Sequence, residues 1–412
     1  MTGWEIRSLA EVCAIKPPKA EARARLAADC EVSFAPMYVL GIDAKYMTPT
    51  AVRPLADVSG SYTYFAEGDV LVAKITPCFE NGKLGIAKGL VNGIGFGSSE
   101  FIVLRPGSEL DREFLYYYLY RSDFREVGAR TMTGAVGHKR VAADFIEQLP
   151  IPIPPLLEQR RIVAILDDAF DAIATAKANA EKNFSAIQEL SAAALNLVFP
   201  VGAESAALAD LAVTIADGDH MPPPKASTGI PFITISNVDK EMRRIDFTDT
   251  YFVSRSYFDG LKPNRRPQAG DVLYTVTGSF GIPVLVEDDR EFCFQRHIGL
   301  IRPKADTNSR WLSYALLSPG VLAQADAQAT GTAQRTVSLA VLRALKVPRV
   351  RTDVQRDTVA KLDAVFEQTA RLRELSKARL AALDELKQSL LHQAFTGKLT
   401  AKTTDKQLEA VA

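Results

Sequence analysis

The amino-acid sequence lacks the features of a membrane, secreted or metal-binding protein. No apolar run approaches the ~18–20 residues needed to cross a membrane, and residues 1–5 (MTGWE) have neither the basic segment nor the apolar core of a secretion signal. The four cysteines form no C-x-x-C pair, and the four histidines neither cluster nor pair with a cysteine. We therefore expect a cytoplasmic protein with reduced cysteines, no membrane association and no structural metal.

An excess of charge of one sign is also missing, because 49 Lys and Arg balance 49 Asp and Glu. A net charge of +0 neither supports nor excludes a nucleic-acid partner, since one cleft can be basic on a neutral chain. With 47% hydrophobic and 24% charged residues, the composition is that of an ordinary globular protein. The length of 412 residues allows about two or three domains.

The chain contains a long internal repeat. Residues 159–170 (QRRIVAILDDAF) return as residues 355–366 (QRDTVAKLDAVF), at an offset of 355 − 159 = 196. Shorter matches are Thr133-Gly134 with Thr330-Gly331 and 104–106 with 301–303, both at offset 197, and 68–71 with 270–273 at offset 202. This period is too long for a solenoid unit. It predicts a whole domain plus a helix, duplicated, and hence a pseudo-twofold molecule.

Residues 1–150 are predicted to form a domain of mixed α and β structure. Two short apolar runs, 70–75 and 101–104, predict strands. Residues 112–127, rich in Tyr and Leu, predict a helix. The glycines of 93–97 predict a loop and not a nucleotide site, because their spacing is G-x-G-x-G and a strand follows where a helix should begin.

Two long helices are predicted after the two domains. The prolines of 149–155 forbid a helix there and favour an extended segment, whereas no Gly or Pro interrupts the chain from Leu156 to about Val198. The repeat of this segment, 352–395, predicts a second helix. At ~44 residues each helix is roughly 65 Å long and needs a partner to be stable. Because the halves repeat head to tail, a twofold relation makes the pair antiparallel.

Apolar residues in both helices alternate at four and three residues, as in the seam of a coiled coil. The predicted seam contains, in the first helix, Ile162, Leu166, Ala169, Ile173, Ala176, Ala180, Asn183, Ile187, Leu190, Ala194 and Leu197. In the second it contains Leu362, Val365, Thr369, Leu372, Ser376, Arg379, Leu383, Leu386 and Leu390, and Val359, Phe366 and Leu380 widen the apolar face. A face this wide suggests more than one partner surface. Asn183 and Arg379 are predicted to fix the register from the middle of the seam.

These elements give the predicted organisation of the chain. It consists of a first globular domain (1–150), a central long helix (151–200), a second globular domain (201–348), a C-terminal long helix (349–400) and a tail (401–412). The predicted fold class is mixed α/β, with two globular domains joined by two long helices that form an antiparallel coiled coil.

This arrangement resembles the specificity subunits of type I restriction-modification systems, over nearly the whole chain. The most specific matches are residues 149–162 (LPIPIPPLLEQRRI) and 68–83 (GDVLVAKITPCFENGK). Residues 217–225 (DGDHMPPPK) and 390–399 (LLHQAFTGKL) also resemble segments of that family. The second half departs from the pattern, because only Val347-Pro348 stands where the first half has four prolines.

The resemblance implies a DNA-reading scaffold without catalysis of its own. Each globular domain would be a target-recognition domain that reads one half of a split, asymmetric sequence in double-stranded DNA, and the helices would hold the two readers at a fixed separation. Two methyltransferase subunits would dock on the helices and bring S-adenosylmethionine, so this chain itself would bind no cofactor. Restriction (motor-nuclease) subunits would join to cleave unmodified DNA.

Candidate DNA-contacting residues are polar side chains in or beside Gly-containing loops, because phosphates bind cations and base edges need donors and acceptors. In the first domain they are Lys74, Asn81, Lys83, His138, Lys139 and Arg140. In the second they are Ser236, Asn237, Arg265, Arg266, Ser279, Arg296, His297, Gln334 and Arg335. The strongest candidates are the pairs Lys139-Arg140 and Gln334-Arg335, which follow Thr-Gly at nearly the same distance. For each single residue, the alternative is an ordinary solvated surface group.

No carboxylate in the sequence is predicted to be catalytic. Asp69 and Asp271, each after a glycine, are predicted to satisfy local backbone donors in a turn before a strand. Asp167, Asp168 and Asp363 are predicted to be solvated carboxylates on the long helices. Glu385 and Lys387 have a nuclease-like spacing but lie inside a helix, and residues 222–224 (PPP) lack the pattern of an aminomethyltransferase loop.

Two alternatives to a specificity subunit remain. A stand-alone restriction enzyme or methyltransferase would need a catalytic domain, but the duplicated unit already occupies residues 1–400. A purely structural coiled-coil adaptor would not need two large globular domains.

Overall fold

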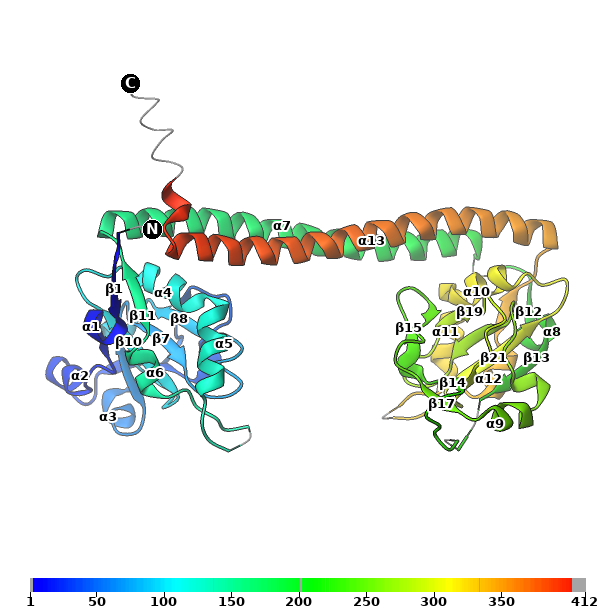
Figure 1. The fold of residues 1–412 in the computed structure, drawn as a ribbon, viewed down its shortest axis with the longest axis horizontal. Helices are drawn as coiled ribbons and strands as arrows, with labels where there is room; N and C mark the ends of the chain where they lie inside the picture. Colours follow the sequence, from blue (N-terminus) through cyan, green and yellow to red (C-terminus); the bar gives the residue numbers. More distant parts are fainter. Residues whose placement is uncertain are drawn as a thin grey trace, which may run out of the picture. The chain divides into compact units, whose positions relative to one another are not determined.

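The computed structural model (Figure 1) describes residues 3–135, 137–200, 202–218, 220–221, 223–332 and 334–401. The tail predicted after residue 401 lies outside the described residues, and so do Asp219 and Pro222 of the segment 217–225. The chain divides into two compact units, residues 1–178 with 380–412 and residues 179–379. Each unit contains a globular domain and a part of each of two long helices.

The globular domain of the first unit is built on two sheets. A five-stranded sheet has the order β2-β10-β7-β8-β4, a four-stranded sheet has the order β5-β3-β9-β6, and β1 pairs with β11. The strands are β1 (Glu5–Ser8), β2 (Cys13–Ile15), β3 (Glu31–Ala35), β4 (Tyr46–Met47), β5 (Ala51–Pro54), β6 (Thr63–Ala66), β7 (Val70–Ala73), β8 (Leu84–Ala87), β9 (Ile94–Gly97), β10 (Phe101–Pro106) and β11 (Pro150–Ile153). The strands predicted over 70–75 and 101–104 are confirmed as β7 and β10.

Helices cover these sheets; α1, α4, α5 and α6 contribute to the largest core of the unit, and α2 and α3 contribute to a smaller one. They are α1 (Leu9–Val12), α2 (Ala20–Arg25), α3 (Leu55–Val58), α4 (Arg112–Tyr120), α5 (Ser122–Thr131) and α6 (Ala143–Glu147), with short 3-10 turns at Met37–Val39 and Val91–Gly93. The single helix predicted over 112–127 is wrong, because the chain breaks at Arg121, whose backbone is extended (φ −62°, ψ 146°). The side chain of Arg121 folds back over the ring of Tyr118 at 4.0 Å and bonds the carbonyl of that residue.

The loop predicted over 93–97 is also wrong, because residues 94–97 form β9, an inner strand of the four-stranded sheet. Its glycines are needed for close packing. A Cβ on Gly95 would lie 2.2 Å from the ring of Phe65, and one on Gly97 would lie 2.3 Å from the carbonyl of Ala35. The alternation of glycine with Ile and Phe is thus the pattern of a crowded buried strand.

The globular domain of the second unit repeats this design. Its sheets have the orders β13-β21-β18-β19 and β17-β14-β20, and β12 pairs with β22 and β15 with β16. The strands are β12 (Ser205–Ala207), β13 (Ala212–Asp217), β14 (Ile230–Ile233), β15 (Val238–Asp239), β16 (Arg244–Ile245), β17 (Tyr251–Val253), β18 (Val272–Thr275), β19 (Pro283–Leu285), β20 (Cys293–Phe294), β21 (Ile298–Pro303) and β22 (Lys346–Pro348). The helices are α8 (Leu208–Leu211), α9 (Arg255–Gly260), α10 (Ser309–Leu317), α11 (Pro319–Gln328) and α12 (Leu339–Ala344), with 3-10 turns at Ile235–Asn237 and Pro263–Arg265.

The two domains share the strand order of their main sheets over four strands. The order β13-β21-β18-β19 matches β2-β10-β7-β8, and all of these pairs are antiparallel. The second sheet of each domain contains one parallel pair, β3 with β9 in the first and β14 with β20 in the second. The duplication predicted from the sequence is therefore confirmed in the fold.

Two long helices, α7 (Leu156–Val198) and α13 (Thr352–Phe395), pack together within each unit. In the first unit, the start of α7 shares a core with the end of α13, through Ile162, Leu166 and Leu391. In the second unit, the end of α7 shares a core with the start of α13, through Leu195 and Leu362. The pair is therefore antiparallel, as predicted, and α7 starts directly after the extended proline segment (Figure 1).

One of the two predicted rows of the seam is buried or half-buried along each helix, and the other is partly exposed. Leu190 and Leu197 are 52% and 85% exposed, and Leu372 and Leu386 are 45% and 46% exposed. The described contacts instead run through residues such as Ser191 and Leu195 in α7, and through Phe366, Arg373, Leu380 and Lys387 in α13. The buried face keeps a seven-residue spacing along both helices, so the prediction placed one of its two rows one position too early.

The prediction that Asn183 and Arg379 fix the register is wrong, because both side chains are exposed. Half-buried polar residues at the interface include Arg373, which lies over the ring of Phe184 at 5.7 Å, and Lys387, which lies over Phe170 at 5.0 Å.

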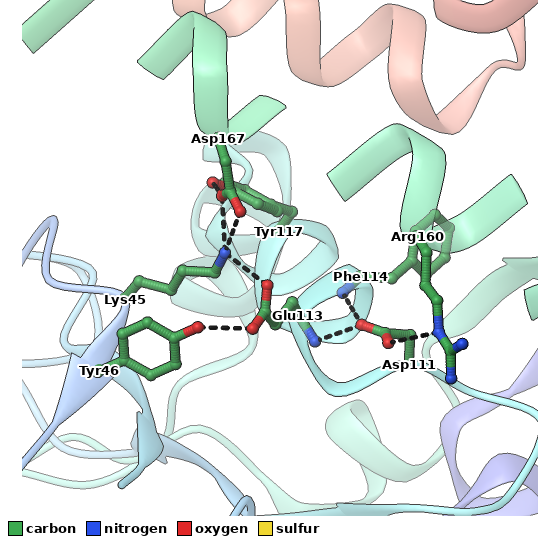
Figure 2. Close-up of polar contacts among 8 residues, drawn as sticks. All are labelled: Lys45, Tyr46, Asp111, Glu113, Phe114, Tyr117, Arg160 and Asp167. Atoms are coloured by element: carbon green, nitrogen blue, oxygen red, sulfur yellow. Dashed lines mark hydrogen bonds and ion pairs between the residues drawn. The ribbon is translucent and has the colours of Figure 1, made fainter. Parts of the chain in front are cut away.

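Each domain is joined to its long helix by a cluster of polar contacts (Figure 2). In the first unit, the ammonium of Lys45 lies between the carboxylates of Glu113 (2.7 Å) and Asp167 (2.6 Å). The hydroxyl of Tyr117 also donates to Asp167, and the hydroxyl of Tyr46 donates to Glu113 at 2.5 Å. These contacts connect the loop before β4, the helix α4 and the long helix α7.

The second unit has a related junction, in which the hydroxyl of Tyr314 donates to Asp363 at 2.6 Å and the guanidinium of Arg310 pairs with Asp363 at 2.9 Å. The prediction that Asp167 and Asp363 are solvated helix carboxylates is therefore wrong. Both are anchors that fix a globular domain on a helix.

The aspartates after Gly68 and Gly270 behave as predicted. Asp69 accepts the N–H of Ala66 (2.8 Å) and Asp271 accepts that of Gln268 (2.9 Å), as in a turn. Each also forms a bidentate pair with an arginine of the neighbouring strand, Arg105 at 2.7 and 2.8 Å and Arg302 at 2.8 and 2.8 Å. Both carboxylates are buried and fully committed to these structural contacts.

Candidate nucleic-acid interface

In the first domain, a loop after α5 lies against the chain that leaves β7. Residues 75 and 140, and residues 133 and 140, form isolated β-bridges. The N–H of Thr76 donates to the carbonyl of Lys139, and the N–H of Val141 donates to that of Lys74, both at 2.9 Å. In Figure 1 this loop projects from the side of the domain that lies away from α7. Candidate residues separated by more than sixty positions in the sequence are thus brought together.

The second domain has the same arrangement. Residues 277 and 336, and residues 330 and 336, form isolated β-bridges. The N–H of Gly278 donates to the carbonyl of Arg335 at 2.9 Å, and the N–H of Val337 donates to that of Val276 at 2.8 Å. Position by position, Arg335 therefore corresponds to Lys139, and Thr336 corresponds to Arg140. The sequence comparison had instead paired Lys139 with Gln334 and Arg140 with Arg335, one residue earlier in the second loop.

Glycine allows both loops to close tightly. Gly134 and Gly331 have φ values of +127° and +103°, which side chains rarely tolerate. A Cβ at Gly134 would lie 2.8 Å from the carbonyl of His138, and one at Gly331 would lie 2.4 Å from the carbonyl of Gln334. The Thr-Gly repeat in the sequence marks this shared loop geometry.

In the first domain, Arg140 forms a bidentate ion pair with Glu100, with Nε–Oε2 at 2.9 Å and Nη2–Oε1 at 2.8 Å. This pairing lowers the pKa of Glu100, with a further contribution from Lys74, and it raises the pKa of Arg140. Both groups are thus charged at neutral pH. Glu100 was not among the residues predicted from the sequence, because nothing in the linear pattern places it beside the Thr-Gly loop.

The other candidates of the first domain differ in whether their side chains are exposed or bonded within the protein. Asn81, His138 and Lys139 are exposed on this loop region. Lys74 is half-buried, and the ammonium of Lys83 donates to the carbonyl of Met37 at 3.0 Å. Lys83 therefore serves the local fold, whereas the three exposed groups are available to a ligand.

In the second domain, the equivalent surface is hollowed. A cavity of about 360 Å³ is lined by residues that include three of the predicted ones, Arg296, His297 and Gln334, together with Asp217, His220 and Thr336. Arg265 also belongs to this region, since it donates to Asp217 at 3.0 Å, and Asp217 contacts His220 at 2.5 Å. Burial and the neighbouring charge of Arg296 lower the pKa of His297. Asp217, His220 and Thr336 were not predicted.

Several predicted residues of the second domain have structural partners. Asn237 is 6% exposed, accepts the N–H of Thr234 at 2.9 Å and donates to the carbonyl of Asp249 at 2.8 Å. Arg266 donates to the carbonyls of 259 and 261. These two residues hold loops in place.

The remaining candidates of this domain are exposed but engaged. The hydroxyl of Ser236 contacts that of Thr234 at 2.7 Å, and that of Ser279 accepts from Lys240 at 2.8 Å. Arg335 pairs with Asp326 at 2.5 Å. Each such contact can be exchanged for one to a ligand, because surface pairs contribute little to stability.

Among the side chains that the structure describes, no three His, Cys, Asp or Glu residues come together as ligands for a metal ion. The described helices include none with the length and apolar character required to span a membrane.

Comparison with known proteins identifies the relatives of this chain. Residues 1–182 match the family model of the type I restriction modification DNA specificity domain. Two specificity subunits from Escherichia coli, those of the type I restriction enzymes EcoAI and EcoEI, are each 40% identical to this chain over 163 and 162 residues. The match covers 39% of this chain and only 27% of the length of either relative. The resemblance seen in the sequence is thereby confirmed.

Similarity over a longer stretch is weaker in sequence. The specificity subunit of the type I restriction enzyme MjaVIII from Methanocaldococcus jannaschii is 21% identical over 338 residues, which is 75% of each chain. Solved structures match the fold. A chain from a study of complex assembly in the type I system has a TM-score of 0.78 at 22% identity, over 97% of this chain and 99% of that one. The HsdS subunit from Thermoanaerobacter tengcongensis has a TM-score of 0.62 at 21% identity, over 97% and 98%.

Proposed function

We propose that this chain is the DNA-specificity subunit of a type I restriction-modification complex, reading a bipartite, asymmetric target in double-stranded DNA in the cytoplasm. The observation that carries the proposal is the duplicated loop pair. The two domains present the same backbone arrangement, but the side chains on it differ, with Glu100 and Arg140 in one and His297 and Thr336 in the other. Two readers of one design with different chemistry suit a target with two unlike halves.

The exposed polar groups on these loops can perform both parts of DNA recognition. Lys139 and Arg296 are exposed cations that can bind phosphates and set the position of the domain on the duplex. Asn81 and Gln334 are exposed amides, and an amide can bond the two polar atoms of an adenine edge at once. The second domain offers these groups around a hollow, whereas the first offers them beside an ion pair.

The long helices provide the surface for protein partners. Leu190 and Leu197 in α7 are exposed although they lie seven residues apart on one face. Leu372 and Leu375 are similarly exposed on α13. Exposed leucines at helical spacing are the anchors of helix-to-helix docking. In this proposal, two methyltransferase subunits cover these leucines and bring S-adenosylmethionine, and restriction subunits join the complex.

This chain contributes no reacting group. Its carboxylates at the repeated positions, Asp69, Asp271, Asp167 and Asp363, are each committed to arginine, lysine or tyrosine partners that hold the fold. The proposed role is to select the site and to place the partner enzymes on it.

The test is to express the chain with and without a type I methyltransferase subunit and to map methylated adenines in the host DNA. The proposal predicts methylation at one bipartite sequence only when both proteins are present. Methylation by the chain alone, or no stable complex with the methyltransferase, would contradict it.

A further inference from the structure

The two readers carry different side chains at one structurally equivalent position before β10 and β21. In the first domain, the N–H of Lys74 donates to the carbonyl of Glu100 at 2.9 Å. In the second, the N–H of Val276 donates to the carbonyl of His297 at 2.9 Å. Arg140 and Thr336 also correspond. The first domain therefore has a charged pair, Glu100 with Arg140, at the place where the second domain has an imidazole and a hydroxyl group.

The charged pair leaves one edge of a guanidinium unused. Glu100 takes Nε and Nη2 of Arg140, and the carbonyl of His138 accepts from Nη1 at 3.2 Å. A guanidinium has five N–H donors in one plane, so these three contacts leave one N–H on Nη1 and one on Nη2. This edge has the spacing that bonds O6 and N7 of guanine in the major groove.

The environment favours a base over a phosphate as the ligand of Arg140. Its side chain is 46% exposed while that of Glu100 is 20% exposed, so the arginine is the outer member of the pair. The carboxylate offsets the charge of the guanidinium and so weakens its attraction for a phosphate, but it does not disturb hydrogen bonds to a neutral base. A clamped side chain also loses less rotamer freedom when it binds.

We propose that Arg140 reads a guanine in the half-site of the first domain, and that Glu100 is the positioning residue that holds the guanidinium for this contact. The inference rests on the proposed function and specifies one base of the first half-site together with the residue that reads it. At the corresponding place the second domain has His297 and Thr336 in a hollow of about 360 Å³. The second half-site therefore carries a base pair read by a different group at this position.

The experiment uses the full chain in complex with its methyltransferase and maps methylated sites for the wild type and for Glu100→Gln, Arg140→Lys and a control. Glu100→Gln keeps the size of the side chain but loses the charge that clamps Arg140. We expect both variants to tolerate other bases at one guanine of one half-site, with affinity for the original site reduced roughly 5- to 150-fold. The other half-site should be unchanged. Glu126→Gln, an exposed residue of α5, is the control and should keep the original site.

A charge-swapped variant, Glu100→Arg with Arg140→Glu, separates base reading from a structural role. It keeps an ion pair at this place but presents a carboxylate, which accepts from the amino group of cytosine instead of donating to guanine. We expect it to lose the guanine while its melting temperature stays near that of the wild type.

Retention of the original site by the swapped variant would show that the pair is structural and would overturn the inference. The same holds if Glu100→Gln and Arg140→Lys leave every base of the half-site unchanged. In both cases the wild type would still methylate a bipartite site, so the proposed function would stand. A wild-type complex without any bipartite site would overturn both.

Discussion

Gln159 and Gln355 hold the same place in the first turns of the two long helices and make the same three kinds of hydrogen bond. The side-chain oxygen of Gln159 accepts the N–H of Asp111, and that of Gln355 accepts the N–H of Asn308, both at 2.7 Å. Each amide nitrogen donates to two carbonyls, one before the helix and one in the globular domain. The repeated Gln-Arg of the sequence thus marks a buried clamp between domain and helix.

The clamp predicts that replacing this one glutamine strongly lowers the free energy of unfolding. Gln159 is fully buried, so Gln159→Ala leaves a backbone N–H and two carbonyls without a partner, which costs about 1–3 kcal/mol for each unsatisfied group. We expect a loss of several kcal/mol in the free energy of unfolding, measured by urea denaturation. Gln368→Ala, an exposed glutamine on α13, should change the stability by less than about 0.5 kcal/mol. Equal effects of the two substitutions would refute the clamp.

The junction at Lys45 predicts a dependence of stability on pH. Burial alone would raise the pKa of Glu113, but the hydrogen bonds from Lys45 and Tyr46 lower it below the ordinary value of 4.5. A carboxylate with a lowered pKa stabilises the fold above its unfolded pKa, and this contribution is lost as the pH falls through its folded pKa. The stabilisation should therefore be complete at neutral pH and disappear below 4.5.

The variant Lys45→Met tests this junction. Without the ammonium, burial raises the pKa of Glu113 against weaker opposition, mainly from the hydrogen bond of Tyr46, so the stabilising charge is lost at higher pH. At neutral pH we expect the variant to be less stable by about 1–3 kcal/mol, and the difference should shrink on acidification. Lys182→Met, an exposed residue of α7, serves as control. A difference from wild type that stays constant between pH 7 and pH 3 would contradict the assignment.

The exposed leucines of α13 predict that substitutions there weaken binding of the partner subunit without lowering the stability of this chain. Leu372→Ser and Leu375→Ser remove apolar surface that is 45% and 59% exposed in this chain, so the chain itself should lose less than about 0.5 kcal/mol of stability. Binding of the methyltransferase should weaken at least tenfold, as measured by calorimetry. A variant of the buried Leu362 should do the reverse, with a lower melting temperature. Full binding by both surface variants would place the partner elsewhere.

The sequence was informative where a property repeats along the chain. The offset near 196 identified the duplication, the Gly- and Pro-free stretch from Leu156 gave the start of α7, and Thr133-Gly134 marked the interface loop. These features depend on local backbone chemistry, which the order of residues encodes directly.

The sequence was less informative where a side chain meets a distant partner. Glu100 lies forty residues from Arg140, and no linear spacing indicates that a bidentate pair joins them. The one-residue difference that pairs Thr336 with Arg140 arises from the length of the second loop, which only backbone hydrogen bonds reveal. The seam failed at Asn183 because the half-buried row runs one position later, through Phe184, and apolar residues at neighbouring positions leave that choice open in the sequence.

The central claim is that one chain carries two readers of unlike half-sites, and the methylated sites of a host with the complete system test it most directly. The mapping should compare the wild type with two double variants, Lys139→Ala with Arg140→Ala and Gln334→Ala with Arg335→Ala. We predict one bipartite, asymmetric sequence for the wild type, with loss of selectivity in one half-site for the first variant and in the other half-site for the second. A continuous or palindromic site, or changes in the same half-site for both variants, would contradict the account.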